Sequence, residues 1–247
     1  MKQLRRIRDL TNLVVRATDG EIGSVQELYF DDRSWVVRYL VVETGWLLGR
    51  EILLATAAIG RIDDVNGAME IALTKEQIER SPPIDAAKPL SREYEESYFR
   101  HFQWAPYWEP GPTTWGGSVP YPGTPPMSID TVLPADAPEN PHLRTSKEVL
   151  GYEIRASDGA VGHVEDLVVD DEDWMVRYVE VDTKNWLPGK KVLLQTMRID
   201  HISWLERSVI VTLARQAIES APAYDPSQLI TPDYEVQLFK HYGKAAA

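Results

Sequence analysis

The stretch that decides the fold occurs twice in this chain. Residues 17–54 read ATDGEIGSVQELYFDDRSWVVRYLVVETGWLLGREILL. Residues 156–194 read ASDGAVGHVEDLVVDDEDWMVRYVEVDTKNWLPGKKVLL, with one extra residue near Asn185. A self-match of this length indicates a duplicated structural unit, so each local interpretation applies to both copies.

Aspartate and glycine recur at the same places in both copies. Asp19-Gly20 corresponds to Asp158-Gly159, a dipeptide that is typical of a tight turn between strands. Gly23 and Gly162 lie inside strand-like stretches, where an isolated glycine indicates a β-bulge or a sharp bend. The apolar positions change parity at the same point, which supports a bulge in each copy.

A run of aromatic and β-branched residues follows an acidic turn in each copy. Trp35 to Val42 predicts a strand that carries apolar side chains on both faces. Such a strand needs something packed outside the barrel as well as inside it. One of its faces recurs with the same three residue types: Trp35, Val37 and Tyr39, repeated as Trp174, Val176 and Tyr178.

An arginine stands in the middle of each of these strands. Arg38 and Arg177 share the parity of apolar neighbours, so each guanidinium should be half-buried. A half-buried cation needs an anion nearby. We therefore expect a structural ion pair with a turn carboxylate such as Asp31 or Asp170, and no substrate binding at these positions.

The residues that recur in order form a recognisable set. The run D-G-x-x-G-x-V, then D-D-x-x-W-x-V-R-Y, then W-x-x-G-(R/K)-x-(I/V)-L-L, which contains Trp46 or Trp186, resembles the PRC-barrel domain in its tandem bacterial form. The resemblance covers residues 3–103 and 142–243, and it implies two small, strongly bent antiparallel β-barrels. Related domains occur in the H subunit of photosynthetic reaction centres and in the rRNA-processing protein RimM, and in neither does the barrel catalyse a reaction.

The chain divides into three segments. We expect a first barrel with a helical arm in residues 1–103, a linker in residues 104–141, and a second barrel with a helical arm in residues 142–247. The linker holds ten of the seventeen prolines, four glycines, and no lysine or arginine, so it cannot build regular structure. Its aromatic residues, among them Trp104, Tyr107 and Trp108, predict that its first part lies along the protein surface and that its middle is mobile.

Two helices are predicted in each copy. Thr74 and Gln77 are spaced as a capping box, which begins a short helix that runs to about Arg80. Ala214 replaces the capping threonine in the second copy, so that helix should start less sharply. Ser91 and Thr231-Pro232 are typical starts of a second helix in each copy.

An aromatic stripe marks this second helix. Tyr94, Tyr98 or Phe99, and Phe102 fall at helical spacing, as do Tyr234, Leu238 or Phe239, and Tyr242. Two interpretations are open: the stripe packs on its own barrel, or it forms a ridge that binds a partner. We favour packing on the barrel, because the strand needs an outer cover.

Composition bounds the function. The net charge is −12, the isoelectric point is near 4.9, and all three segments hold more acidic than basic residues, so no nucleic-acid partner is expected. Local basic spots such as Arg5 to Arg8 should be solvated. The absence of cysteine is compatible with a cytoplasmic location. No signal peptide is recognised, and no apolar run approaches the ~18 residues of a membrane helix, so no membrane insertion is expected.

Motifs of catalysis and metal binding are weak throughout. The five histidines have no ligand-like spacing, and His101 and His241 stand at equivalent helix ends, where a cation suits the helix dipole. Asp170 to Asp173 could attract a hard cation such as Ca²⁺, but an acidic hairpin turn is the favoured interpretation. No hydrolase, phosphate-loop or dinucleotide motif is present. We therefore expect no enzyme activity, no metal and no cofactor.

Three functional hypotheses follow from this. The first is a non-catalytic protein-interaction or assembly module with an unknown protein partner, in which the two barrels also pack on each other within the chain. The second is an accessory factor in ribosome or RNA maturation, and the segment charges argue against it. The third is an accessory protein of a membrane-proximal photosynthetic or electron-transfer complex, and the missing membrane helix argues against it. A likeness of fold is a weak argument for either analogy.

Overall fold

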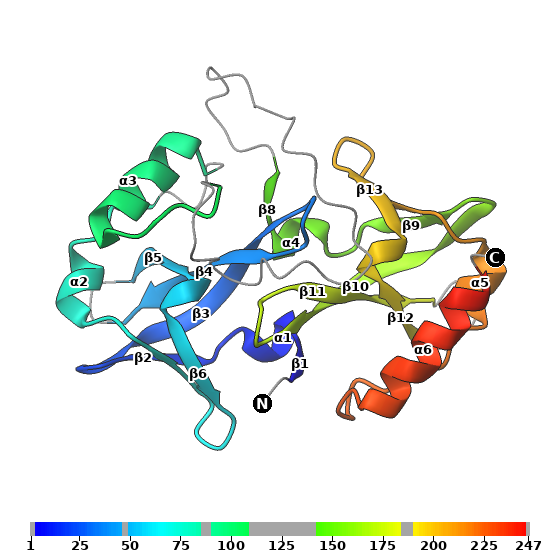
Figure 1. The fold of residues 1–247 in the computed structure, drawn as a ribbon, viewed down its shortest axis with the longest axis horizontal. Coiled ribbons are helices and arrows are strands. Elements are labelled where there is room, and N and C mark those ends of the chain that lie inside the picture. The colour runs from blue at the N-terminus through cyan, green and yellow to red at the C-terminus, as the bar shows by residue number, and fades with distance from the viewer. Residues whose placement is uncertain (1–2, 46–48, 85–89, 109–141, 184–189, 246–247) are drawn as a thin grey trace. The chain divides into compact units, whose positions relative to one another are not determined.

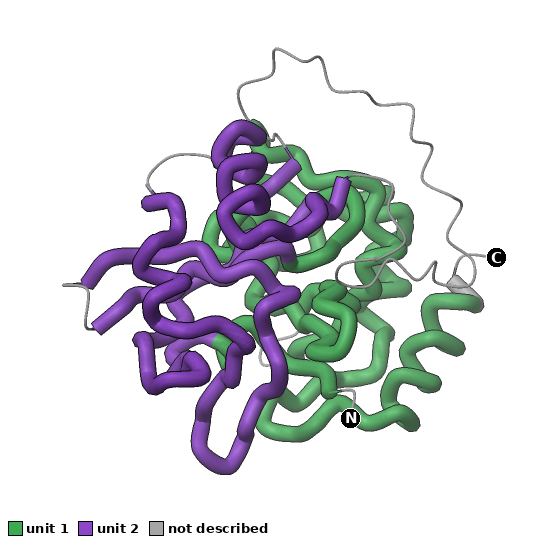
Figure 2. The backbone as a smooth tube through the Cα atoms, turned by 60° about the vertical axis from the view of Figure 1, so that its left-hand side comes forward, with its two compact units in different colours: residues 1–10, 32–37, 145–247 green, residues 11–31, 38–144 purple. Residues whose placement is uncertain are grey.

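The computed structural model describes residues 3–45, 49–84, 90–108, 142–183 and 190–245. The chain forms two compact units (Figure 2). Unit 1 comprises Met1–Leu10, Asp32–Val37 and Thr145–Ala247, and unit 2 comprises Thr11–Asp31 and Arg38–Arg144. These units differ from the segments 1–103 and 142–247 expected from the sequence, because short pieces of each repeat belong to the sheet of the other.

Unit 2 contains a seven-stranded sheet in the order β5-β4-β3-β2-β7-β6, with β8 paired to β3 (Figure 1). A 3-10 turn, Thr56–Ala58, connects β5 to β6. The strands are β2 (Val14–Ala17), β3 (Gly20–Asp31), β4 (Val37–Thr44), β5 (Arg50–Ala55), β6 (Ile59–Asp63), β7 (Ala68–Ile71) and β8 (Leu143–Thr145).

Unit 1 repeats this arrangement in the order β12-β11-β10-β9-β14-β13, with β1 paired to β10. A 3-10 turn, Thr196–Arg198, connects β12 to β13. The strands are β1 (Leu4–Arg6), β9 (Glu153–Ala156), β10 (Gly159–Asp170), β11 (Val176–Asp182), β12 (Lys191–Gln195), β13 (Ile199–Ser203) and β14 (Ser208–Val211).

Both sheets are mixed, which corrects the antiparallel barrels expected from the sequence. β2 pairs with β7 in parallel, and β9 pairs with β14 in parallel. The members of each pair are far apart in the chain, so no hairpin fixes their relative direction. Among the described strands the pairing is an open path that ends at β5 and β6, or at β12 and β13, and closure into barrels stays a prediction.

The first strand of each repeat joins the sheet of the other repeat. β1 pairs with β10, with Leu4 opposite Asp170 and Arg6 opposite Val168, while β8 pairs with β3. The two strands have nearly equal sequences, Leu-Arg-Arg and Leu-Arg-Thr, so either one fits either sheet. The exchange is thus reciprocal, as in domain swapping between identical subunits.

The helices are short except for the second helix of each repeat. They are α1 (Ile7–Leu10), α2 (Lys75–Glu79), α3 (Arg92–Phe102), α4 (Ser146–Val149), α5 (Arg215–Glu219) and α6 (Pro232–Ala245). None of the helices in the described ranges is long and apolar enough to cross a lipid bilayer.

The predicted capping box at the start of α2 is confirmed. The Thr74 hydroxyl accepts from the Gln77 N–H, and the Gln77 side chain accepts from the Thr74 N–H at 2.9 Å. α5 has no side-chain cap at Ala214, yet it begins at the equivalent residue and has the same length as α2. The less sharp start expected from the sequence is therefore not observed.

The aspartate of the Asp-Gly turn explains why α5 still begins cleanly. Asp158 Oδ1 accepts from the Arg215 N–H at 2.7 Å, and Asp19 Oδ1 accepts from the Lys75 N–H at 2.9 Å. These bonds satisfy one of the first N–H groups of each helix, which have no partner within the helix. The turn residue thus acts as a second cap from a distant part of the chain.

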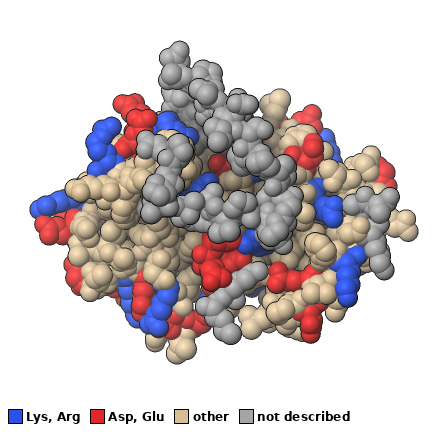
Figure 3. All heavy atoms as spheres, in the orientation of Figure 1, with Lys and Arg blue, Asp and Glu red and all other residues tan. Residues whose placement is uncertain are grey.

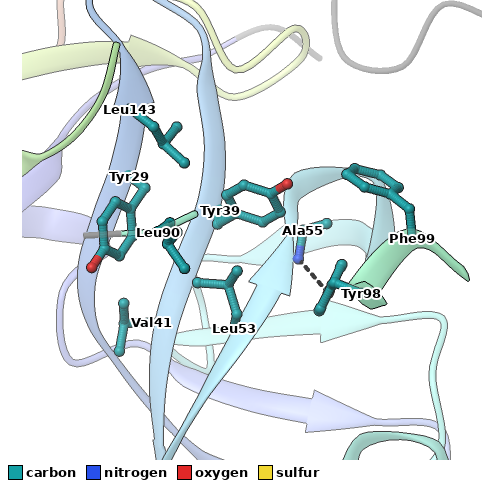
Figure 4. Close-up of a cluster of buried hydrophobic side chains, with 9 residues drawn as sticks. All are labelled: Tyr29, Tyr39, Val41, Leu53, Ala55, Leu90, Tyr98, Phe99 and Leu143. Atoms are coloured by element: carbon teal, nitrogen blue, oxygen red, sulfur yellow. Dashed lines mark hydrogen bonds between the residues drawn. The ribbon is translucent and has the colours of Figure 1, made fainter. Parts of the chain in front are cut away.

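The outer face of the sheet in unit 2 is covered by α3 (Figure 4). Tyr98 and Phe99 are buried, and the Tyr98 hydroxyl accepts from the Ala55 N–H at 3.0 Å. Burying each large apolar side chain contributes roughly 1.5–3 kcal/mol. The expectation that this stripe packs on its own sheet is confirmed for α3. The cluster consists of Tyr29, Tyr39, Val41, Leu53, Ala55, Leu90, Tyr98, Phe99 and Leu143.

The first part of the linker also lies on this cluster. Trp104, Tyr107 and Trp108 are partly buried against it, as expected for the first part of the linker. Trp104 stacks on Phe102 with ring centroids 4.7 Å apart. The expected mobility of the middle of the linker concerns residues outside the described ranges. Residues 104–108 are called the aromatic strap below.

Candidate interaction surface

The second helix of each repeat is attached to its unit by the same bonds. The Tyr94 hydroxyl donates to the Pro82 carbonyl at 3.0 Å in unit 2, and the Tyr234 hydroxyl donates to the Pro222 carbonyl at 3.1 Å in unit 1. The proline that ends the preceding short helix therefore fixes the position of the next one. The two helices can be compared residue by residue.

The equivalent histidines of α3 and α6 each bind a backbone carbonyl of the preceding short helix, α2 or α5. His101 Nε2 lies 3.3 Å from the Gln77 carbonyl oxygen, and His241 Nε2 lies 2.6 Å from the Ala217 carbonyl oxygen. A ring nitrogen that faces a carbonyl must carry a proton and donate it. These histidines link helix to helix, which gives them a role beyond the helix dipole expected from the sequence.

A tyrosine on the sheet meets a glutamate on the helix in both units. The Tyr39 hydroxyl donates to Glu95 Oε1 at 2.8 Å, and the Tyr178 hydroxyl donates to Glu235 Oε1 at 2.9 Å. Burial, and next the charge of Glu95, raise the pKa of Tyr39 well above its usual value. The phenol therefore remains a proton donor, and both predicted tyrosines serve to hold the helix.

The two repeated arginines, Arg38 and Arg177, each make a contact that holds the guanidinium. Arg177 pairs with Asp170 at 3.2 Å and also contacts Asp173, so the predicted ion pair with a turn carboxylate is confirmed there. Arg38 lies over the ring of Tyr107, with 4.1 Å between its guanidinium carbon and the ring centroid. A guanidinium on an aromatic face is attracted by the ring quadrupole. The aromatic strap therefore supplies a contact that the repeat comparison alone did not predict.

The acidic turn of the second repeat uses its carboxylates internally. Asp170 Oδ1 accepts from the Glu172 N–H at 3.1 Å, and Asp173 Oδ1 accepts from the Met175 N–H at 3.0 Å. With Arg177 on the remaining side, these contacts support the interpretation as a hairpin turn. Within the described ranges, no three His, Cys, Asp or Glu side chains are grouped to hold a metal ion.

Gly23 and Gly162 lie where two strands approach closely. A Cβ at Gly23 would stand 1.8 Å from the Glu43 carbonyl oxygen, and one at Gly162 would stand 2.2 Å from that of Asp182. The pairing also shifts by one residue beside each glycine, as a bulge requires. The predicted bulges are confirmed, and the lack of a side chain is needed for the approach of the next strand.

The two tryptophans of the acidic turns do not begin a strand as expected. Trp35 and Trp174 have φ of 59°, the left-handed region that residues with side chains rarely adopt. Within unit 1, the Val37 N–H donates to the Trp174 carbonyl at 2.8 Å and the Val176 N–H donates to the Trp35 carbonyl at 2.7 Å. The turn conformation is thus fixed by a reciprocal pair of backbone bonds. Trp46 and Trp186 lie outside the described residues.

A buried acidic pair in unit 1 was not recognised from the sequence. Asp166 and Glu180 are opposite each other on β10 and β11, and both are buried. Glu180 binds Lys191 Nζ at 2.6 Å, and Asp166 lies 3.7 Å from Arg8 Nε. Burial raises the pKa of Asp166 to about 6, against the N–H of Leu167 and the charge of Arg8. The first repeat has Glu27 and Val41 at these positions. The change from valine to glutamate at Glu180 is the feature of the sequence that could have indicated the acidic pair.

The outer side of α6 is more exposed than that of α3. Leu238 and Tyr242 are fully buried, and the Tyr242 hydroxyl donates to the Leu193 carbonyl at 2.9 Å. On the other side of the helix, Val236 is 49% exposed and Phe239 is 60% exposed. The packing interpretation of the stripe is confirmed for Leu238 and Tyr242, whereas Phe239 faces solvent and the partner-binding ridge stays a prediction. We call Val236 and Phe239 the α6 face.

Charges of both signs occur together on the side of the molecule that is shown in Figure 3, where lysine and arginine are interspersed with aspartate and glutamate among other residues. Exposed ion pairs include Arg61 with Glu70 at 2.9 Å, across β6 and β7, and Arg155 on β9 with Glu206 in the turn before β14 at 2.9 Å. Exposed pairs of this kind contribute little to stability. The described charges therefore single out no site, and the α6 face remains the candidate.

Comparison with known families identifies the repeat. The family model of the PRC-barrel domain matches residues 2–78 and 142–213, once in each repeat. No curated protein matches the chain at a significant level.

Proposed function

The chain belongs to the PRC-barrel family, and from this premise and the α6 face we propose that it is a non-catalytic module for protein interaction or assembly. The observation that carries the proposal is the exposure of Val236 and Phe239 on a helix whose position is fixed by hydrogen bonds. Aromatic side chains that project from a rigid support are typical of binding hot spots.

The roles of the charged residues favour binding over catalysis. Arg177 is held by Asp170, Lys191 is held by Glu180, and Glu95 is enclosed by Tyr39 and Tyr107. Each of these groups joins one element of a unit to another. The proposal accordingly assigns no catalytic residue and no cofactor, and it places the partner on the α6 face.

Affinity capture from the native cells tests this proposal. The tagged full-length protein is compared with V236E and F239S, and proteins that co-purify after crosslinking are identified by mass spectrometry. We expect at least one protein to be captured by the wild type and lost from both variants. The control is L205S, because Leu205 is 96% exposed elsewhere in unit 1. Equal capture by all four proteins would refute the proposal.

The proposal also predicts weak RNA binding. With a net charge of −12, the protein should bind an RNA oligonucleotide only at low salt and without sequence preference. Filter binding at ~0.05 and ~0.15 M salt measures this, since nonspecific contacts to phosphate weaken steeply with salt. Tight binding at the higher salt would favour the role in RNA maturation.

A further inference from the structure

The two units differ in what covers equivalent phenylalanines. Phe99 on α3 and Phe239 on α6 occupy the same position in the repeat, two residues before the histidine that binds the preceding short helix. Phe99 is 1% exposed, whereas Phe239 is 60% exposed. The difference does not come from the attachment of the helices, because both are fixed by the same tyrosine and histidine bonds.

The aromatic strap is what covers Phe99 in unit 2. The ring centroids of Tyr107 and Trp108 lie 6.1 and 5.3 Å from that of Phe99, in edge-to-face arrangements. Such pairs are favourable beyond the area they bury. The strap has the sequence Trp-Ala-Pro-Tyr-Trp. Its proline disfavours helix, and Tyr107 and Trp108 form a turn.

Four groups of unit 2 surround the Tyr107 side chain, and one of them is Arg92, whose guanidinium carbon lies 5.8 Å from the ring centroid. Glu95 accepts its hydroxyl proton at 2.9 Å, Arg38 lies 4.1 Å from its ring centroid, and Phe99 meets its edge. Glu95 thus contacts the phenol hydroxyl, Arg38 the face of the ring, and Phe99 the ring in a T-shaped arrangement. Burial, and next the charge of Glu95, raise the pKa of Tyr107, so the phenol stays protonated.

Unit 1 keeps three of the four residue types of this phenol site, and its arginine is held in place by ion pairs with Asp170 and Asp173. Arg177, Glu235 and Phe239 stand at the repeat positions of Arg38, Glu95 and Phe99. The positions of Trp104 and Tyr107, however, are occupied by Lys244 and Ala247. Val236 replaces Glu96, which makes the outer side of α6 more apolar than that of α3. Unit 1 therefore has the residues that would contact a tyrosine, but the residues at the strap positions are different.

We infer that the α6 face, together with Arg177 and Glu235, binds a short segment of a partner protein that carries aromatic residues around a proline. The segment covers α6 as the aromatic strap covers α3, with a tyrosine between Phe239 and Arg177 and its hydroxyl donating to Glu235. This inference rests on the proposed function and names the chemistry of the partner. Pro232 replaces Arg92, which lies over Trp108 at 3.8 Å and over Tyr107 at 5.8 Å, so Arg177 and Glu235 supply the polar contacts to the tyrosine.

A synthetic peptide with the strap sequence tests the inference on the full-length protein. The fluorescently labelled peptide Gln-Trp-Ala-Pro-Tyr-Trp is titrated with protein, and its anisotropy is measured. In unit 2 the equivalent site is already covered by the chain's own strap, whose effective concentration is far higher than that of the peptide. Binding should therefore occur at α6, with amide NMR shifts confined to α6 and the neighbouring strands.

The variants decide whether the contact is the one inferred. F239S should weaken binding at least ~10-fold, and V236E, which introduces the residue type of the first repeat, should weaken it ~3–10-fold. A peptide with phenylalanine in place of tyrosine should bind ~5-fold more weakly, because it cannot donate to Glu235. L205S should bind as the wild type, and thermal melting shows that each variant is folded.

Several results would overturn the inference. They are the absence of binding at ~1 mM protein, binding that F239S leaves unchanged, or NMR shifts away from α6. Concentration-dependent self-association that F239S abolishes would also overturn it, because a second copy of the chain would then be the occupant. If the peptide fails while protein capture still depends on Phe239, the proposed function stands and only the partner chemistry is wrong.

Discussion

At several positions in this protein, the close approach of neighbouring strands determines which residue type or backbone conformation is possible. Gly23 and Gly162 leave room for a backbone carbonyl of the next strand, and the bulges beside them turn the long strands β3 and β10. Trp35 and Trp174 adopt a left-handed conformation that costs ~1–3 kcal/mol, and backbone hydrogen bonds offset the cost. Each of these positions is fixed by its neighbours in space more than by its own preference.

Substitution of the bulge glycine should be severe. Gly23→Val places a branched side chain against the Glu43 carbonyl, so either β3 or β4 must shift. We expect the free energy of unfolding to fall by at least ~1–3 kcal/mol in urea denaturation. Gly45→Ala is the control, because nothing lies within 4 Å of its Cβ. Similar unfolding midpoints for the two variants would contradict the close approach.

The buried acid of unit 1 predicts a pH dependence. Because the folded state raises the pKa of Asp166 from 3.8 to about 6, its stabilising contribution is present below about 3.8 and is lost as the pH rises through about 6. Asp166→Asn stays neutral, so it should raise the free energy of unfolding by ~1–3 kcal/mol at high pH and change it little at low pH.

Urea denaturation of Asp166→Asn at about pH 4 and pH 8 measures this gain. The control is Asp225→Asn, because hydrogen bonds from Ser227 lower the pKa of the exposed Asp225, and its neutral form should give no gain at high pH. A variant of Asp166 that is equally or less stable than the wild type at pH 8 would show that Arg8 and the Leu167 N–H compensate for the burial.

At the scale of elements, equivalent helices differ in the side chains that cap their first turns. α2 has a complete capping box, whereas α5 has none, yet both begin at the same place because Asp19 or Asp158 binds the first N–H. α3 and α6 likewise share their attachment but differ in their outer cover. The duplicated architecture thus tolerates the loss of individual contacts.

Exchanging the cap residues should move stability in opposite directions. Thr74→Ala removes the bond to the Gln77 N–H and should cost ~0.5–2 kcal/mol, whereas Ala214→Thr offers a new acceptor to the exposed start of α5 and should gain up to ~1 kcal/mol. Thermal unfolding of the two single variants and the double variant measures both effects. A loss of stability in Ala214→Thr would mean that Asp158 already satisfies this helix start completely.

At the scale of the whole molecule, the exchange of first strands defines each unit. β1 and α1 belong to unit 1, although they begin the first repeat in the chain, and β8 belongs to unit 2. Arg5 on β1 pairs with Asp171 at 2.7 Å, with both side chains largely buried, so the exchanged segment contributes polar as well as apolar contacts. A cut at the linker therefore removes one strand from each sheet.

Fragments of the chain test this exchange. Residues 11–144 contain the whole of unit 2, whereas residues 1–103 lack β8. We expect fragment 11–144 to unfold at a higher urea concentration than fragment 1–103. Fragments 1–103 and 142–247 should associate when mixed, because each carries a strand of the other's sheet. Equal stability of the two first-repeat fragments, with no association, would contradict the exchange.

The sequence by itself determined the duplication, the strands, the bulge glycines and the helix starts, because these depend on local periodicity, glycine sterics and capping chemistry. It did not determine which sheet takes which first strand, because Leu4 to Arg6 and Leu143 to Thr145 are interchangeable locally. It also did not reveal the parallel pairs, the buried Asp166 or the contrast between Phe99 and Phe239. Only the tertiary structure decided these features, because each depends on which segment, distant in the sequence, packs against the residue or strand concerned.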